Sequence, residues 1–110
     1  MTINYNNKTF KVAGDSDDVT HFKYYQKGDI LWGEYEGGGV TKGSLIAKVE
    51  PNGTLQMHYQ HLNANLEFKL GKCVSIPKIL QDGRIELFEK YESVNTEIIN
   101  KGEITLIEVI

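Results

Sequence analysis

The sequence predicts an all-β domain, an up-and-down antiparallel barrel of about eight strands. Turn signals recur at short and fairly even intervals, and two of them, Asn52-Gly53 and Asp82-Gly83, supply the positive φ angles of tight hairpins. The runs between the turns are rich in Val, Ile, Thr, Tyr and Phe, and several alternate with a period of two. A length of 110 residues suits one domain, which we expect to span residues 1–110.

Short connections require neighbouring strands to pair antiparallel, and we expect the last strand to close onto an early one. Accumulated twist and exposed edges favour closure into a barrel, and a two-sheet sandwich is the alternative. A single helical turn within residues 92–99 is the most helix that the pattern allows. The predicted strands cover residues 8–13, 20–27, 29–36, 40–50, 54–62, 66–76, 84–92 and 102–109.

Composition and charge exclude several classes of function. The net charge is −3 and Lys and Arg never form a run of three, which does not suit a nucleic-acid partner. No run approaches the ~20 apolar residues of a membrane-spanning helix. The N-terminal residues lack the pattern of a signal peptide, so we expect a cytoplasmic protein. Cys73 is the sole cysteine, which excludes an internal disulfide.

Five stretches of the chain form a familiar pattern: residues 28–46, 57–61, 71–77, 83–91 and 101–103. Together they resemble a family of small bacterial proteins that carry the name N-acetylglutamate synthase. The resemblance covers nearly the whole chain and implies a barrel of the avidin or lipocalin type. Acetyl transfer would need a glycine-rich loop at the start of a helix, where backbone N–H groups hold the acetyl-CoA pyrophosphate. Gly37-Gly38-Gly39 lies between two predicted strands instead, so we expect no acetyltransferase activity.

Two motifs that suggest phosphate or calcium lack the required arrangement. Lys42-Gly43-Ser44 reverses the Gly-Lys-Ser order of a phosphate loop, and a strand rather than a helix follows it. Asp15, Asp17 and Asp18 have no bidentate Glu at the distance that a calcium loop requires. We therefore interpret them as a hairpin segment and a solvated acidic loop.

The histidines and the cysteine offer little chemistry. His58 and His61 are three residues apart, so a strand directs them to opposite faces, and nothing fixes His21 near either one. Cys73 with His61 is the only pair that could act as nucleophile and base, and buried cysteines are usually inert. We expect no catalytic residues, no metal and no cofactor.

Parity along the strands predicts a polar patch inside the barrel. Leu55 and Met57 face the core and carry Tyr59 and His61 inward, and Ile85 and Leu87 do the same for Glu89 and Tyr91. Cys73 and Ser75 lie on one face of their strand, and Leu70 and Val74 lie on the other. Because the apolar pair also favours the interior, either face could point inward. Such a patch is satisfied either by a closed internal network or by a ligand. The predicted ligand-binding residues are Tyr35, Tyr59, His61, Cys73, Ser75, Glu89 and Tyr91.

The sequence thus favours a non-catalytic barrel that binds a small, partly apolar ligand in its interior. The alternative is a filled barrel that acts through a homodimer or protein-partner surface. Tyr24, Tyr25, Trp32 and Tyr35 cluster on adjacent strands, and the consecutive tyrosines must face opposite ways. An outward aromatic patch would suit a dimer face.

Overall fold

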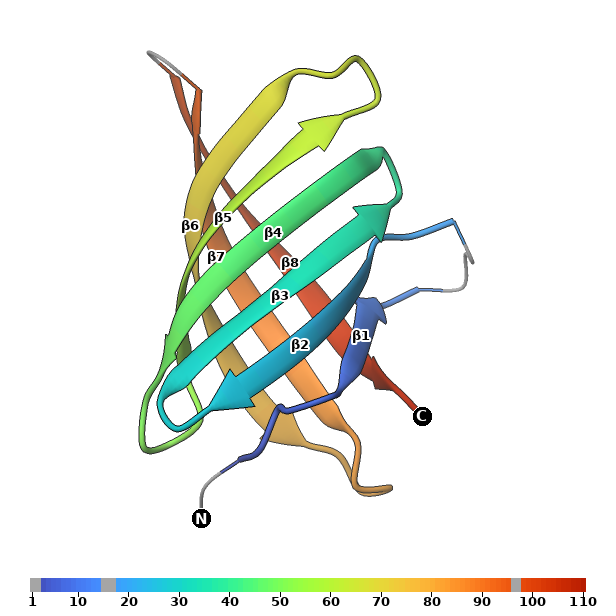
Figure 1. The fold of residues 1–110 in the computed structure, drawn as a ribbon. Helices are drawn as coiled ribbons and strands as arrows, with labels where there is room; N and C mark the ends of the chain where they lie inside the picture. Colours follow the sequence, from blue (N-terminus) through green and yellow to red (C-terminus); the bar gives the residue numbers. More distant parts are fainter. Residues whose placement is uncertain (1–2, 15–17, 96–97) are drawn as a thin grey trace.

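All regular structure in the computed structural model is β-strand. The model describes residues 3–14, 18–95 and 98–110, and within them there is no helix, hence none that could span a membrane. The strands form one closed antiparallel barrel (Figure 1), so the predicted fold class is confirmed and the sandwich alternative is wrong. The strands are β1 (Thr9–Val12), β2 (His21–Lys27), β3 (Ile30–Gly37), β4 (Val40–Val49), β5 (Leu55–Asn63), β6 (Phe68–Ile79), β7 (Ile85–Asn95) and β8 (Ile98–Val109).

The strands follow one another around the barrel in sequence order. Each pairs with the next, and β8 closes the sheet against β1, with Val109 opposite Thr9 and Leu106 opposite Val12. This confirms the expected closure of the last strand onto an early one. Gly53 and Gly83 have φ angles of 88° and 91°, the positive values that their Asn-Gly and Asp-Gly turns predicted.

The last hairpin differs from the prediction. The helical turn allowed within residues 92–99 is wrong, because β7 continues to Asn95 and β8 begins at Ile98 rather than at residue 102. Val94 pairs with Leu70 on one side and with Ile99 on the other. This ladder satisfies the backbone N–H and C=O groups as strand, and it overrides the turn preference of the Ser and Asn residues there.

Strand β6 is also shifted relative to the predicted range 66–76. Leu66 has a φ angle of 59°, which places it in the preceding turn rather than in a strand. At the other end β6 continues through Pro77 to Ile79. The pairing of β6 with β5 ends at Ser75, so one edge of β6 is unpaired beyond that residue. Proline is tolerated in strands at such an edge.

One end of the barrel is filled with side chains, and we call it the closed end. The start of β1 and the C-terminal end of β8 lie there (Figure 1). The Tyr5 hydroxyl donates a hydrogen bond to the Gly53 carbonyl at 2.6 Å. Behind Tyr5 the rings of Phe10 and Tyr24 pack with centroids 5.1 Å apart. The side chains that are fully buried here and along the barrel are Tyr5, Phe10, Tyr24, Leu31, Leu55, Leu87, Leu106 and Ser75.

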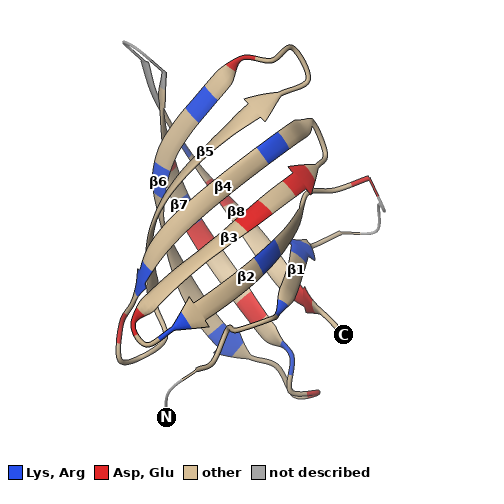
Figure 2. Cartoon of the chain, viewed as in Figure 1, with Lys and Arg blue, Asp and Glu red and all other residues tan. Residues whose placement is uncertain are grey.

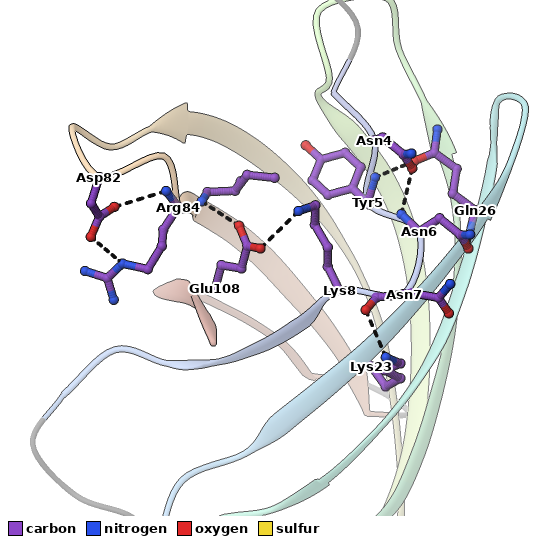
Figure 3. A network of polar contacts seen from close by, with 11 residues as sticks. Asn4, Tyr5, Asn6, Asn7, Lys8, Lys23, Gln26, Asp82, Arg84 and Glu108 are labelled. Carbon is purple, nitrogen blue, oxygen red and sulfur yellow. Dashed lines mark hydrogen bonds and ion pairs between the residues drawn. The ribbon is translucent and has the colours of Figure 1, made fainter. Parts of the chain in front are cut away.

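Polar contacts fasten the N-terminal segment across the closed end (Figure 3). Glu108, only 8% exposed, accepts hydrogen bonds from Lys8 Nζ and from the Ile85 N–H, each at 3.0 Å. The Gln26 side chain accepts a bond from the Tyr5 N–H at 2.9 Å. Elsewhere acidic and basic residues are interspersed along the strands rather than gathered on one of them (Figure 2). The chain thus supplies the partners for the carboxylate that it buries at this end.

Candidate functional site

The other end of the barrel encloses a cavity of about 450 Å³. We call it the open end; the β3–β4, β5–β6 and β7–β8 hairpins meet there (Figure 1). Phe22, Leu45, Met57 and Ile104 give the cavity an apolar wall. Its size lies within the roughly 300–1,000 Å³ of small-molecule sites.

Tyrosine–glycine pairs across neighbouring strands keep this cavity open. In each pair the tyrosine ring lies over the glycine, so that a Cβ atom on the glycine would collide with it. The rings therefore lie against the barrel wall rather than across the lumen. Three such pairs line the cavity with one tyrosine from each hairpin of the open end: Tyr35 with Gly43, Tyr59 with Gly71, and Tyr91 with Gly102.

An aromatic group with one hydrogen bond occupies one side of the cavity. The Tyr35 hydroxyl and His61 Nδ1 are 2.9 Å apart, and the Tyr35 ring stacks on Phe22 at 5.1 Å. The rings of Tyr59 and His61 are nearly parallel at 6.4 Å. Burial and the positive charge of Lys69 lower the pKa of His61, so the ring is neutral at pH 7. The aromatic rings on this side of the cavity therefore present uncharged faces.

Glu89 is the buried charged group of the cavity. Its side chain is inside the barrel and the residue is 4% exposed. Ser75 donates a hydrogen bond to one carboxylate oxygen, Oε2. Desolvation raises the pKa of Glu89 to about 7, and the Ser75 bond only partly opposes it. Glu89 and Lys69 are the only charged side chains among the lining residues, and Lys69 follows the β5–β6 turn at the open end.

Cys73 faces the cavity but is not arranged as a nucleophile. Its Sγ lies 3.5 Å from Met57 Sδ and 4.0 Å from Ser75 Oγ. Burial, followed by the Glu89 charge, raises the pKa of the thiol to about 12, so no thiolate is present at neutral pH. The hydrogen bond of His61 goes to Tyr35. The Cys73–His61 pair is therefore not assembled for catalysis in this structure.

All of the predicted ligand-binding residues lie on the inner side of the barrel. Ser75 is fully buried and reaches the cavity only through its bond to Glu89. Leu70 and Val74 are 48% and 42% exposed, which resolves the contested parity of β6 in favour of Cys73 and Ser75. The other six line the cavity: Tyr35, Tyr59, His61, Cys73, Glu89 and Tyr91.

The remaining candidates from the sequence lie apart from the cavity. His21 and His58 are exposed on the outer wall, on β2 and β5. Asp15 and Asp17 of the acidic loop lie outside the described residues. Among the residues that the structure describes, no three His, Cys, Asp or Glu side chains are grouped as metal ligands.

Several cavity residues were not predicted from the sequence, although the alternation of side chains along the strands would have placed most of them inside the barrel. Phe22 and Leu45 share faces with inward neighbours two residues away. Ser93 continues the face of Glu89 and Tyr91, but the predicted strand ended at residue 92. Asn100 was missed for the same reason, because the predicted last strand began at residue 102.

The comparisons with known proteins agree with this geometry. No curated protein and no solved structure matches the chain. One protein family, described as avidin-like protein, matches residues 3–109. That match spans all eight strands of the closed barrel and both ends described above. The chain therefore belongs to the avidin-like protein family.

Proposed function

We propose that this protein binds a small, partly apolar ligand inside the barrel and performs no covalent chemistry on it. The observation that carries the proposal is the cavity of about 450 Å³ at one end of a barrel whose other end is filled. Membership of the avidin-like family supports it. The proposed site consists of Tyr35, Tyr59, His61, Cys73, Ser75, Glu89 and Tyr91.

The wall of the cavity suits such a ligand in two respects. Phe22, Leu45 and Met57 offer apolar surface, whose burial against a ligand drives binding. The hydroxyls of Tyr59 and Tyr91 and the carboxyl of Glu89 add a few polar groups that can fix its orientation. Because the tyrosine rings are already held against the wall, little side-chain order has to be gained on binding.

Blocking the open end tests the proposal. A fragment library is screened against the full chain by ligand-observed NMR, and the hits are repeated with Ser93→Trp, in which a large side chain enters the cavity. The matched control is Ser44→Trp, because Ser44 is exposed on the outer side of β4. We expect Ser93→Trp to lose the hits and Ser44→Trp to keep them. Hits that bind both variants equally would place the ligand site elsewhere.

A second candidate function, a homodimer or protein-partner surface, is favoured by the outer wall. Tyr25 and Trp32 stack there with centroids 6.1 Å apart. Trp32 is 42% exposed and lies beside Ile46, which is 60% exposed. Sedimentation velocity at micromolar concentration tests this role, with Trp32→Lys as the disrupting variant. A monomer in both cases would remove the homodimer.

We also propose a cytoplasmic protein that needs no cofactor and no nucleic acid. An acetyl-transfer role is not part of the proposal, because Gly37-Gly38-Gly39 joins β3 to β4 without a helix to receive a pyrophosphate. Calorimetry with acetyl-CoA checks this point. We expect no heat of binding at micromolar concentrations.

A further inference from the structure

The polar floor of the cavity has unmet hydrogen-bonding capacity. Glu89 accepts its hydrogen bond through Oε2, and no other donor in the described part of the chain contacts it. The Tyr24 hydroxyl, outside the cavity lining, is also buried without a partner among the described residues. Burial, and then the nearby Glu89 carboxyl, raise the pKa of Tyr24 well above its usual range. Buried polar groups normally have partners, so the Glu89 carboxyl, which does line the cavity, is suited to receive one from a ligand.

The other buried glutamate shows how this barrel treats a carboxylate that serves structure. Glu108 is held by Lys8 Nζ and by the Ile85 N–H, each at 3.0 Å. Glu89 has neither a cation nor a backbone donor among the described contacts. A carboxylate removed from water is costly unless a positive charge or several donors compensate it. A ligand can supply what the chain does not.

The surroundings of Glu89 also favour a positive charge. Phe22, Tyr35, Tyr59 and Tyr91 line the same cavity, and aromatic faces attract cations through their negative π surfaces. Among the described residues of the lining, Lys69 at the mouth is the only Lys or Arg, so none lies beside Glu89 to compete with a cationic ligand. An anionic ligand would meet the Glu89 charge at the end of an apolar channel, which is unfavourable.

We propose that the cavity binds a small organic cation, a protonated primary amine on an apolar body, whose ammonium group donates to Glu89 among the tyrosine rings. This inference rests on the proposed function and specifies its ligand class. The apolar body would lie along Leu45 and Met57 toward the open end. The ammonium group would provide the charge-assisted hydrogen bonds that Glu108 receives from Lys8.

Three probes of nearly equal size and different charge test the proposal: benzylammonium, benzyl alcohol and benzoate. Each is titrated into the isotope-labelled full chain at pH 8 and followed by NMR. We expect benzylammonium to bind about tenfold more tightly than benzyl alcohol, because a charge-assisted hydrogen bond is worth that much, and benzoate to bind most weakly. In Glu89→Gln the preference for the cation should disappear, while benzyl alcohol keeps its affinity within about twofold.

A pH titration of the unaltered protein keeps the test independent of whether Glu89→Gln folds. With a pKa of about 7, the Glu89 carboxyl is mostly ionised at pH 8 and mostly protonated at pH 6. Benzylammonium should therefore bind about tenfold more weakly at pH 6, and benzyl alcohol should not change. Of the other groups facing the cavity, Tyr35, Tyr59 and Cys73 stay neutral over this range, because burial raises the pKa of each. Burial and the Lys69 charge lower the pKa of His61, which favours its neutral form. Tyr91 and Lys69 are the remaining titratable groups in the lining.

The outcomes separate this inference from the proposed function. Tighter binding of benzyl alcohol or benzoate, or a cation preference that survives in Glu89→Gln, would overturn the cation while leaving a ligand cavity in place. Failure of all three probes, in a protein whose other fragment hits are lost in Ser93→Trp, would also overturn the cation alone. If the fragment screen itself finds nothing in the cavity, the proposed function fails.

Discussion

The two ends of the barrel each bury a glutamate, and they treat it differently. At the closed end Glu108 has a lysine and a backbone donor from the chain itself (Figure 3). At the open end Glu89 has one serine and faces a cavity. The same residue type on the same inner surface is thus a structural element in one place and an available group in the other. Both glutamates are buried. They differ in how far the chain itself supplies a cation and hydrogen-bond donors for the carboxylate.

Packing follows the same division. At the closed end Tyr5, Phe10 and Tyr24 fill the interior and leave no exposed surface. At the open end each of the three tyrosine rings lies over a glycine on the neighbouring strand, and the interior remains hollow. Stability should therefore depend mainly on the closed end, and binding on the open end.

Removal of a phenylalanine at each end gives the largest effect. Phe10→Ala should lower the free energy of unfolding by about 3–5 kcal/mol, because Phe10 is fully buried in close packing. Phe22→Ala should cost less by at least about 1 kcal/mol, because the space it leaves joins a cavity that already exists. Urea denaturation of both variants measures the difference. Equal losses would show that the open end is as tightly packed as the closed end.

The pH dependence of stability should reveal the unpaired glutamate. The folded-state pKa of Glu89 is raised from 4.5 to about 7 by desolvation. Between these values the unfolded chain ionises first, so stability falls as pH rises through this window, by about 3 kcal/mol in total. Below about pH 4.5 both states are protonated and the contribution is constant.

Glu89→Gln is the control for this pH effect, because it removes the titrating group and keeps a hydrogen-bonding partner for Ser75. His61 has the opposite dependence: its lowered pKa means that stability is lost as pH falls below its ordinary value of 6.5. Both proteins contain His61, so its contribution cancels in the difference between them. Urea denaturation from pH 4.5 to 8 should show the free energy of unfolding of Glu89→Gln rising relative to that of the parent protein as pH rises. A constant difference would contradict the raised pKa.

Replacing Glu108, the glutamate paired with Lys8, should have a smaller effect than replacing Glu89, and it should lower stability rather than raise it. Glu108→Gln should lower stability at pH 7 by about 1–3 kcal/mol, because Lys8 loses its charged partner in a site that is largely buried. Lys8 is one-third exposed, so water screens part of the attraction and the lower half of the range applies. Thermal unfolding of Glu108→Gln, Lys8→Met and the double variant gives the coupling between them. Additive losses would mean that the ion pair contributes nothing.

The fold and part of the cavity wall could be predicted because both follow from period-two parity. Leu55 and Met57 indicate the inner face of β5, and Ile85 and Leu87 that of β7, so Tyr59, His61, Glu89 and Tyr91 follow. Parity holds along a strand regardless of what lies across the barrel. The hairpin of β7 and β8 was predicted too short because Ser93 and Asn95 favour turns locally. The structure is decided instead by strand pairing, of Ser93 with β6 and β8 and of Asn95 with β8.

The pairing of the two glutamates could not be predicted. Lys8 and Glu108 are 100 positions apart, and they meet only because β1 and β8 close the barrel. Parity places Glu89 inside but does not say whether a cation lies opposite it. Parity also does not predict that each tyrosine pairs with a glycine on the neighbouring strand, because that pairing depends on the register of each hairpin. The distinction between a structural and an available carboxylate therefore needed the three-dimensional structure.

Alanine at Gly102, one of the paired glycines, and at Gly33, which lies outside those pairs, should separate a clash with a ring from a clash with the backbone. Gly33→Ala places its Cβ against the Lys23 carbonyl, which the sheet holds in position, and should cost about 1–3 kcal/mol. The atoms nearest to the Cβ of Gly102→Ala belong to the hydroxyl end of the Tyr91 ring, a side chain that can turn toward the lumen, so the cost should stay below about 1 kcal/mol. The moved ring would narrow the cavity, and fragments that bind there should weaken several-fold in Gly102→Ala. In Gly33→Ala, which lies opposite Tyr24 away from the cavity lining, their affinity should be unchanged.

Thermal unfolding and NMR titration of both variants check the two readouts. A Gly102→Ala protein that is strongly destabilised, or that binds fragments as the parent does, would show that Tyr91 is not what keeps this side of the cavity open.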